Sequence, residues 1–172
     1  MKKINFILIS VFFIFIFSVF YLSLQNEQIY DTEDLVGKKI TEVEIDLFGK
    51  DGTFNTKEIS NYQFTLLNFW ASWCGPCRKE HKNLIKLSEN KNLKIIGINF
   101  KDDEINAKNF LKEMGNPFDI LTKDFKGKKA VNFGVYGIPE TILVNQKLII
   151  LKKYIGPLNS KDVNEIRKLI KK

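Results

Sequence analysis

Residues 70–78 read WASWCGPCR, and the organisation of the chain is best argued outward from them. The segment contains both cysteines of the 172-residue chain, Cys74 and Cys77. A nearly continuous apolar run, FTLLNFW at residues 64–70, precedes them and predicts a strand covered on both faces. Residues 78–89 follow with the apolar spacing of a helix. A Cys-x-x-Cys pair between a buried strand and a helix is the setting of a thiol–disulfide redox site.

The position of each cysteine predicts its role. Cys74 is expected at the N-terminus of the helix, where free N–H groups and the helix dipole stabilise an anion and lower the pKa of a thiol. Only a thiolate attacks a disulfide, so Cys74 is the expected nucleophile. Cys77 lies one turn further on and is expected to resolve the mixed disulfide. Gly75 and Pro76 suit the tight start of the helix.

Three other uses of a Cys-x-x-Cys pair fit this sequence less well. A zinc site takes four ligands, and His81 is the only other soft ligand in the chain. Haem attachment requires a histidine directly after the second cysteine, where this chain has Arg78. A purely structural disulfide would close too small a loop to remove much entropy from the unfolded chain. We therefore expect a redox-active disulfide, with no metal and no bound cofactor.

Apolar patterns typical of strands and helices alternate through the rest of the chain. Strands are expected at residues 42–48 and 53–55, which form a hairpin with an Asp-Gly turn, and at residues 93–100, 141–145 and 148–153. Helices are expected at residues 103–114 and from the N-cap Ser160 to the C-terminus. This alternation predicts an α/β protein with helices flanking a central sheet.

The first 24 residues predict a membrane anchor. Lys2 and Lys3 precede an uncharged apolar run at residues 4–24, which as a helix would reach about 30 Å, the thickness of a hydrocarbon core. A cleavable signal peptide has a shorter apolar region and a small-x-small cleavage site, which this run lacks. The lysines place the N-terminus in the cytoplasm by the positive-inside rule. We expect an anchor at 1–24, a tether at 25–35 and a globular domain at 36–172.

The charge of the chain is positive but is not arranged for nucleic acid. Lysine and arginine number 27 against 20 aspartate and glutamate residues, a formal charge of +7 that falls to +5 without the expected anchor. The basic residues are scattered among acidic ones, without a basic stripe that carries interleaved aromatic residues. No nucleic-acid partner is therefore expected.

The cysteine segment resembles the active site of the thioredoxin superfamily. In that superfamily a cis-proline faces the cysteine pair, and Ile138-Pro139 stands at the matching place. The resemblance implies a central mixed sheet flanked by helices, here with an N-terminal β-hairpin extension. It also implies that the backbone of Ile138 pairs with an extended client segment. From the residues alone, Pro139 would be an ordinary turn residue.

Further motifs resemble a narrower family, the membrane-anchored thiol:disulfide interchange proteins of cytochrome c maturation called CcmG or DsbE. The residues that carry this resemblance are GVYGIPET at 134–141, CGPCRKEH at 74–81, NFKDD at 99–103, GNPF at 115–118 and GPL at 156–158. The likeness runs from about residue 35 to residue 158. It covers most of the expected globular domain.

This resemblance implies a dithiol reductant in the periplasm, held by a single span in the bacterial inner membrane. Its implied partners are apocytochrome c or a partner thiol protein, and a transmembrane electron donor of the DsbD or CcdA type. Trp73, Gly75, Pro76, Ile138 and Pro139 would contact the substrate. Glu140 follows the family's acidic residue beside the cis-proline and is a candidate for tuning a thiol pKa or relaying a proton. The alternative for Glu140 is a solvated charge at a strand end.

Several alternatives stay open. Asn68 stands where many thioredoxins have a buried aspartate, so a general base must lie elsewhere. We interpret His81 as a surface or packing residue, and Trp70 as a core residue. The alternative to the reductant of cytochrome c maturation is another anchored thioredoxin-like enzyme, either an oxidant or a reductase with broader clients. Motif spacing does not distinguish these, because it does not determine the direction of electron flow. A copper chaperone on the same fold would require a Cys-x-x-x-Cys pair and a histidine further downstream.

Overall fold

A computed structural model describes residues 2–25 and 35–171, which fall into two units, Met1–Asp31 and Thr32–Lys172. The first unit contains one helix, α1 (Lys2–Gln25). Its described side chains are largely exposed. Within the described residues, no helix is both long enough and apolar enough to cross a membrane. The predicted tether at 25–35 lies mostly outside the described residues, and the anchor stays a prediction.

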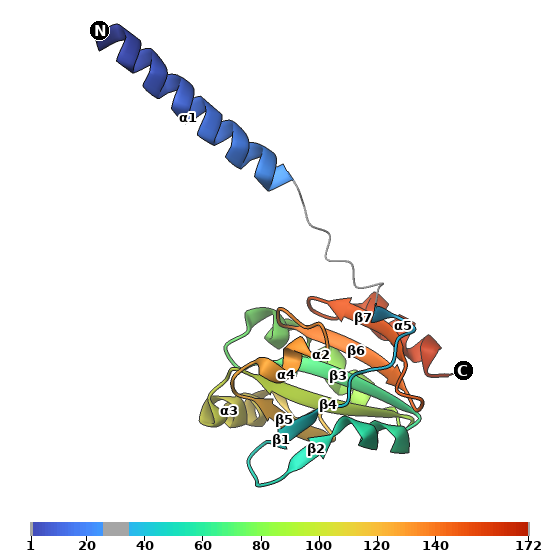
Figure 1. Cartoon of the computed structure of the whole chain (residues 1–172). Helices are drawn as coiled ribbons and strands as arrows, with labels where there is room; N and C mark the ends of the chain where they lie inside the picture. Colours follow the sequence, from blue (N-terminus) through green and yellow to red (C-terminus); the bar gives the residue numbers. More distant parts are fainter. Residues whose placement is uncertain (1, 26–34, 172) are drawn as a thin grey trace. The chain divides into compact units, whose positions relative to one another are not determined.

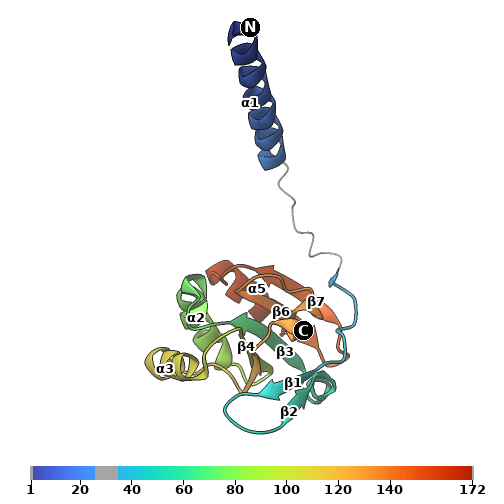
Figure 2. The same ribbon diagram turned by 60° about the vertical axis from the view of Figure 1, so that its left-hand side comes forward.

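The second unit is built on one mixed sheet of seven strands in the order β2-β1-β5-β4-β3-β6-β7 (Figures 1 and 2). The strands are β1 (Glu44–Leu47), β2 (Thr53–Asn55), β3 (Phe64–Trp70), β4 (Leu93–Phe100), β5 (Ile120–Asp124), β6 (Glu140–Asn145) and β7 (Ile150–Ile155). The central strand β3 runs parallel to β4 and antiparallel to β6, and all seven of its residues are buried. The expected mixed sheet and hairpin extension are confirmed.

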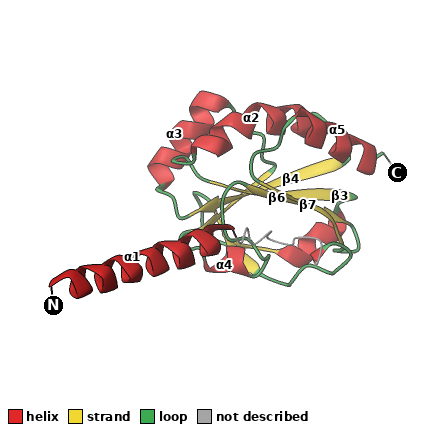
Figure 3. Ribbon diagram, turned by 90° about the horizontal axis from the view of Figure 1, so that it is seen from above, coloured by secondary structure: helices red, strands yellow, loops and turns green. Residues whose placement is uncertain are grey.

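Helices cover both faces of this sheet, as Figure 3 shows. The helices are α2 (Gly75–Ser88), α3 (Glu104–Met114), α4 (Lys128–Val131) and α5 (Ser160–Leu169), together with the 3-10 helix η2 (Thr56–Asn61). The three longer ones, α2, α3 and α5, pack on one face, and α4 lies on the other. Each face has its own apolar core. The cysteines belong to the core under α2, with Trp70 and Leu84, whereas Phe69 and Ile142 belong to the core on the α4 side.

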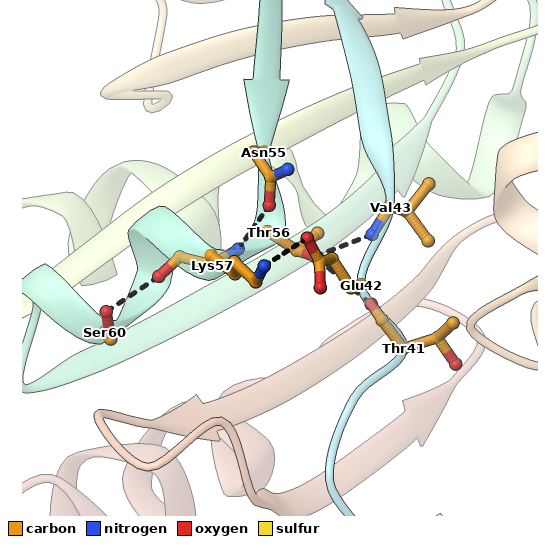
Figure 4. A network of polar contacts seen from close by, with 7 residues as sticks. All are labelled: Thr41, Glu42, Val43, Asn55, Thr56, Lys57 and Ser60. Atoms are coloured by element: carbon orange, nitrogen blue, oxygen red, sulfur yellow. Dashed lines mark hydrogen bonds and ion pairs between the residues drawn. The ribbon is translucent and has the colours of Figure 1, made fainter.

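Polar contacts bind the start of η2, which follows the hairpin, to the chain that precedes the hairpin (Figure 4). The buried Thr56 side chain accepts a hydrogen bond from the Val43 N–H at 2.9 Å and donates one to the Thr41 carbonyl at 3.1 Å. At the surface, Lys57 forms an ion pair with Glu42 at 2.7 Å. The side chain of Thr56 therefore adds to the backbone hydrogen bond that its N–H donates to the Val43 carbonyl at 3.0 Å.

The structure differs from the sequence predictions in several elements: β1 is shorter than the predicted 42–48, and β5, η2 and α4 were not predicted. Strand β5 was not expected, because Thr122 and Asp124 interrupt its apolar pattern. Both are nevertheless buried, since Thr122 donates to the Gly97 carbonyl and Asp124 accepts from two N–H groups of the α4 turn. The N-cap of α5 is Asn159 and not Ser160. Strand β7 begins at 150, two residues later than predicted, because Asn145 accepts N–H bonds that prolong the preceding turn.

Candidate active site

The two cysteines form a disulfide where β3 ends and α2 begins. Cys74 is the N-cap of α2, and its Sγ accepts a hydrogen bond from the Cys77 N–H at 3.1 Å. Gly75 and Pro76 form the first turn, as predicted. A sulfur at this position faces the free N–H groups of the helix, which stabilise a thiolate once the disulfide is reduced. Both cysteines are almost fully buried, so exposure does not show which of them is the nucleophile. Their positions on α2 are the better guide to their roles.

A buried carboxylate holds the loop that carries Trp73. Asp102 accepts hydrogen bonds from the Ser72 N–H at 2.6 Å, from the Ser72 hydroxyl at 2.7 Å and from the Asn99 amide at 2.9 Å. The indole N–H of Trp73 donates to the Lys101 carbonyl at 3.0 Å, yet 60% of Trp73 remains exposed. Trp73 is therefore placed to meet another molecule beside the cysteines.

Trp70 lies in the core, as interpreted from the sequence. It is 2% exposed and stacks on Phe118 with the ring centroids 5.4 Å apart. His81 is also buried. Its Nε2 donates to the Gly115 carbonyl at 2.9 Å, and its ring packs edge-on against Phe110. Burial lowers the pKa of His81. Of the two interpretations of His81, packing is correct and the surface position is wrong.

A carboxylate that the sequence analysis missed lies under the cysteines. Glu80 follows Cys77 by one turn on the buried face of α2 and is 1% exposed. It accepts hydrogen bonds from the Asn68 amide at 2.9 Å and from the Leu158 N–H at 2.7 Å. Burial raises its pKa to about 7, against the lowering effect of these two donors. The i+3 spacing from Cys77 was the available signal, but it did not reveal that Glu80 is buried.

Asn68 completes this polar cluster. Its amide group also donates to the Thr141 hydroxyl at 3.0 Å, so one side chain of β3 connects α2 to β6. Asn68 is not able to act as a general base. Glu80 is a candidate for that role, because its pKa is close to neutral pH.

The loop before β6 carries the other predicted residues. The Ile138–Pro139 peptide is cis. Because Phe69 of β3 pairs with Glu140 of β6, this loop lies at the edge of the sheet where β3 leads into Cys74. The structure thus brings the cysteine turn and Pro139 to the same end of two neighbouring strands.

Glu140 is not a solvated charge, so that alternative is wrong. It is 4% exposed, and its Oε1 accepts the N–H groups of Tyr136 and Gly137 at 3.0 Å each. Its Oε2 lies 2.7 Å from the Nζ of Lys153. Successive residues of a strand point to opposite faces. Glu140 therefore lies on the face opposite Thr141 and its partner Asn68. Its proposed effect on thiol titration stays a prediction.

Comparison with known proteins agrees with this geometry. Residues 35–170 match the Redoxin family. The thiol:disulfide interchange protein HelX of Rhodobacter capsulatus is 40% identical over 124 residues, which cover 72% of this chain and 70% of HelX. The thiol:disulfide interchange protein DsbE of Haemophilus influenzae is 37% identical over 138 residues, 80% of this chain and 76% of DsbE. The chain belongs to the DsbE family of redoxins.

Solved structures support the fold of this DsbE-family chain. A thiol:disulfide interchange protein DsbE from Chlorobium tepidum superposes with a TM-score of 0.67 and 24% identity, over 78% of this chain and 94% of that one. The fold is thioredoxin-like. With its Cys74–Cys77 disulfide, this DsbE-family protein is a thiol–disulfide oxidoreductase.

Proposed function

We propose that the protein is a dithiol reductant in cytochrome c maturation, acting on the haem-site disulfide of apocytochrome c or on a partner thiol protein. The observation that carries the proposal is the cysteine pair at the start of α2, at the same sheet edge as the Ile138–Pro139 loop. The family motifs around both segments support cytochrome c maturation as the process. The chemistry requires no cofactor beyond the two sulfurs.

The reaction transfers two electrons from the cysteines to the client. The Cys74 thiolate attacks one sulfur of the client disulfide, so a Cys74–client bond forms while the client S–S bond breaks and releases a client thiolate. Cys77 then loses its proton, and its thiolate attacks the Cys74 sulfur. The second client thiolate leaves, and the protein is left with the Cys74–Cys77 disulfide. A donor dithiol of the DsbD or CcdA type would restore the reduced pair.

Glu80 is the proposed acceptor of the Cys77 proton. It is buried one turn from Cys77, and its pKa of about 7 allows it to hold or release a proton at neutral pH. Trp73, Gly75 and Pro76 would contact the client beside the sulfurs. The backbone of Ile138, next to Pro139, would pair with an extended client segment.

We also propose that residues 1–24 anchor the protein in the bacterial inner membrane, with residues 36–172 in the periplasm. The uncharged apolar run at 4–24 behind Lys2 and Lys3 supports this arrangement. Fusions of a periplasm-dependent enzyme after residue 35 are expected to be active and to remain with membranes washed in alkaline carbonate. An inactive fusion, or release by carbonate, would contradict the anchor.

The direction of electron flow is tested by the reduction potential of the Cys74–Cys77 couple in defined thiol buffers. A reductant requires a value well below the roughly −120 mV of the strong oxidant DsbA. A value near that of DsbA would make the protein an oxidant. The client is tested separately with Cys77→Ser, which is expected to accumulate a mixed disulfide with an apocytochrome c. The matched variant Cys74→Ser is expected to trap nothing.

A further inference from the structure

A lysine is fully buried beneath the loop that precedes β6. Lys153 of β7 has no exposed side-chain area, and its Nζ lies 2.7 Å from Glu140 Oε2. The same Nζ donates to the Gly134 carbonyl at 2.6 Å. Lysine is almost never fully buried unless it is paired. Its position in the sheet explains the pairing, because Lys153 stands opposite Ile142, and Glu140 is the next residue on the same face of β6.

The ion pair holds the part of the loop that precedes Ile138. Glu140 Oε1 accepts the N–H groups of Tyr136 and Gly137, while Lys153 satisfies the carbonyl of Gly134. Three backbone groups of a six-residue loop therefore depend on two charged side chains. Pro139 is fixed separately, since its carbonyl accepts the Gly156 N–H at 2.9 Å.

The backbone of Ile138, next to Pro139, is left open. Among the described residues, no hydrogen bond is recorded to the N–H or the carbonyl of Ile138. Ile138 thus lies between anchored neighbours with its own backbone groups unused. This is the arrangement required of a backbone that pairs with an incoming extended segment.

The pair is also separated from the sulfur chemistry. Glu140 and Ile142 lie on the face of the sheet that packs with Phe69, whereas Cys74 and Cys77 belong to the core on the opposite face. The ion pair and the two sulfurs therefore lie on opposite faces of the sheet.

We propose that Lys153 is a positioning residue for client binding. Through its buried ion pair with Glu140, it fixes the loop at 134–139 so that the Ile138 backbone is presented to an extended peptide client. This inference rests on the proposed function and adds the residue that determines how well peptide clients bind. It assigns to Glu140 a role in loop geometry.

The test compares Lys153→Met with Lys152→Met in the full chain. Lys152 is the matched control, because it is the neighbouring residue of β7, is half-exposed and lies 3.6 Å from Glu165 at the surface. Reduced protein is assayed with two probes, an oxidised peptide of about 12 residues containing Cys-x-x-Cys-His and the small compound 2-hydroxyethyl disulfide. For Lys153→Met, we expect KM for the peptide to rise about tenfold. The ratio of kcat/KM for the peptide to that for the small disulfide should fall by a similar factor, whereas Lys152→Met should leave it unchanged.

A double variant keeps the test informative if Lys153→Met is poorly folded. Glu140→Gln with Lys153→Met removes both charges and leaves no unpaired buried ion, while the Gln carbonyl is still able to accept from Tyr136 and Gly137. Its peptide KM should lie between those of wild type and Lys153→Met. Amide hydrogen exchange should accelerate at Tyr136 and Gly137 in Lys153→Met and be partly restored in the double variant.

The outcomes separate this inference from the proposed function. A parallel loss of activity toward both probes in the folded double variant, or an unchanged peptide KM in Lys153→Met, would overturn the positioning role. A wild-type protein that reduces neither probe would instead overturn the proposed reductant.

Discussion

The buried carboxylate of Glu80 makes stability depend on pH. Its pKa is about 7 in the folded protein and 4.5 in the reference state of an unfolded chain. Between these values Glu80 holds more of its proton in the folded protein than in the unfolded chain. Its contribution to the unfolding free energy therefore falls as pH rises from about 4.5 to 7, and is constant below and above that range. At about 1.4 kcal/mol per pKa unit, the loss from this one group is roughly 3 kcal/mol.

Glu80→Gln is predicted to remove this dependence. The difference in unfolding free energy between the variant and wild type should shift by roughly 3 kcal/mol in favour of the variant when the pH is raised from 4.5 to 8. This shift does not depend on how stable the variant is at pH 4.5. Urea denaturation of the oxidised proteins at both pH values measures the difference. Glu44→Gln, at an exposed position of β1, serves as the control and should follow wild type. Parallel stability curves for Glu80→Gln and wild type would show that burial does not raise the pKa of Glu80.

Glu80 is also predicted to set the pH profile of the resolving step. If it accepts the Cys77 proton, the rate of mixed-disulfide resolution should rise through pH 7 in the wild-type protein, because the carboxylate form is the base. In Glu80→Gln that rise should disappear and the rate at pH 7 should fall about tenfold or more. Stopped-flow release of a peptide thiol from a preformed Cys74 mixed disulfide measures this step. A profile that keeps its inflection near pH 7 would assign the proton to another group.

The connection between β4 and α3 determines the position of the active-site loop. Asp102→Ala is predicted to destabilise the protein by roughly 3 kcal/mol, because donors of the half-buried Ser72 and of the buried Asn99 lose their acceptor. The fluorescence of Trp73 should change as the loop moves, while Trp70 stays buried. Asp51→Asn, in the exposed hairpin turn, is the control for both measurements. Equal melting temperatures for the two variants would mean that the loop does not depend on Asp102.

The patterns in the sequence were sufficient for the elements whose buried residues are mostly apolar. The bounds of β3 and β4 match the predicted runs, and α3 begins one residue after Asp103, its predicted start and actual N-cap. The pattern of β5 gave no strand signal, because burial there rests on polar side chains with hydrogen-bonding partners elsewhere in the chain. The periodicity of apolar residues indicates which apolar side chains are buried. It does not detect polar side chains that are buried with their hydrogen bonds satisfied.

At the scale of the molecule, the residues of the site also fall into those that the sequence predicts and those that it does not. The cysteine pair was predictable because its chemistry depends on a local turn and one helix. The settings of Glu80 and Glu140 were not, because each depends on tertiary contacts that the sequence pattern does not reveal. Leu158 lies 78 residues beyond Glu80, and the lysine that pairs with Glu140 lies on another strand. The solvated alternative for Glu140 fails because β6 and β7 lie side by side and its carboxylate is buried against Lys153.

The boundary of the folded domain gives the last prediction. Residues 37–40 are hydrogen-bonded to the start of β7, with Gly37 donating to Ile150 and Ile40 donating to Leu148 at 2.8 Å each. The side chain of Ile40 is buried in the core on the α4 side. A chain that starts at residue 32 keeps all of these contacts, whereas a chain that starts at residue 41 loses them.

We therefore expect the chain from residue 32 to match the full-length protein in unfolding free energy and in reactivity with 2-hydroxyethyl disulfide, because both apolar cores lie beyond that point. The chain from residue 41 should be less stable by roughly 3 kcal/mol, the sum expected for one buried isoleucine and the lost backbone hydrogen bonds. Urea denaturation of the three proteins in the same detergent measures both effects. Equal stability of the two truncated chains would place the start of the folding unit after residue 40, and a loss already at residue 32 would show that the first unit contributes to the stability of the second.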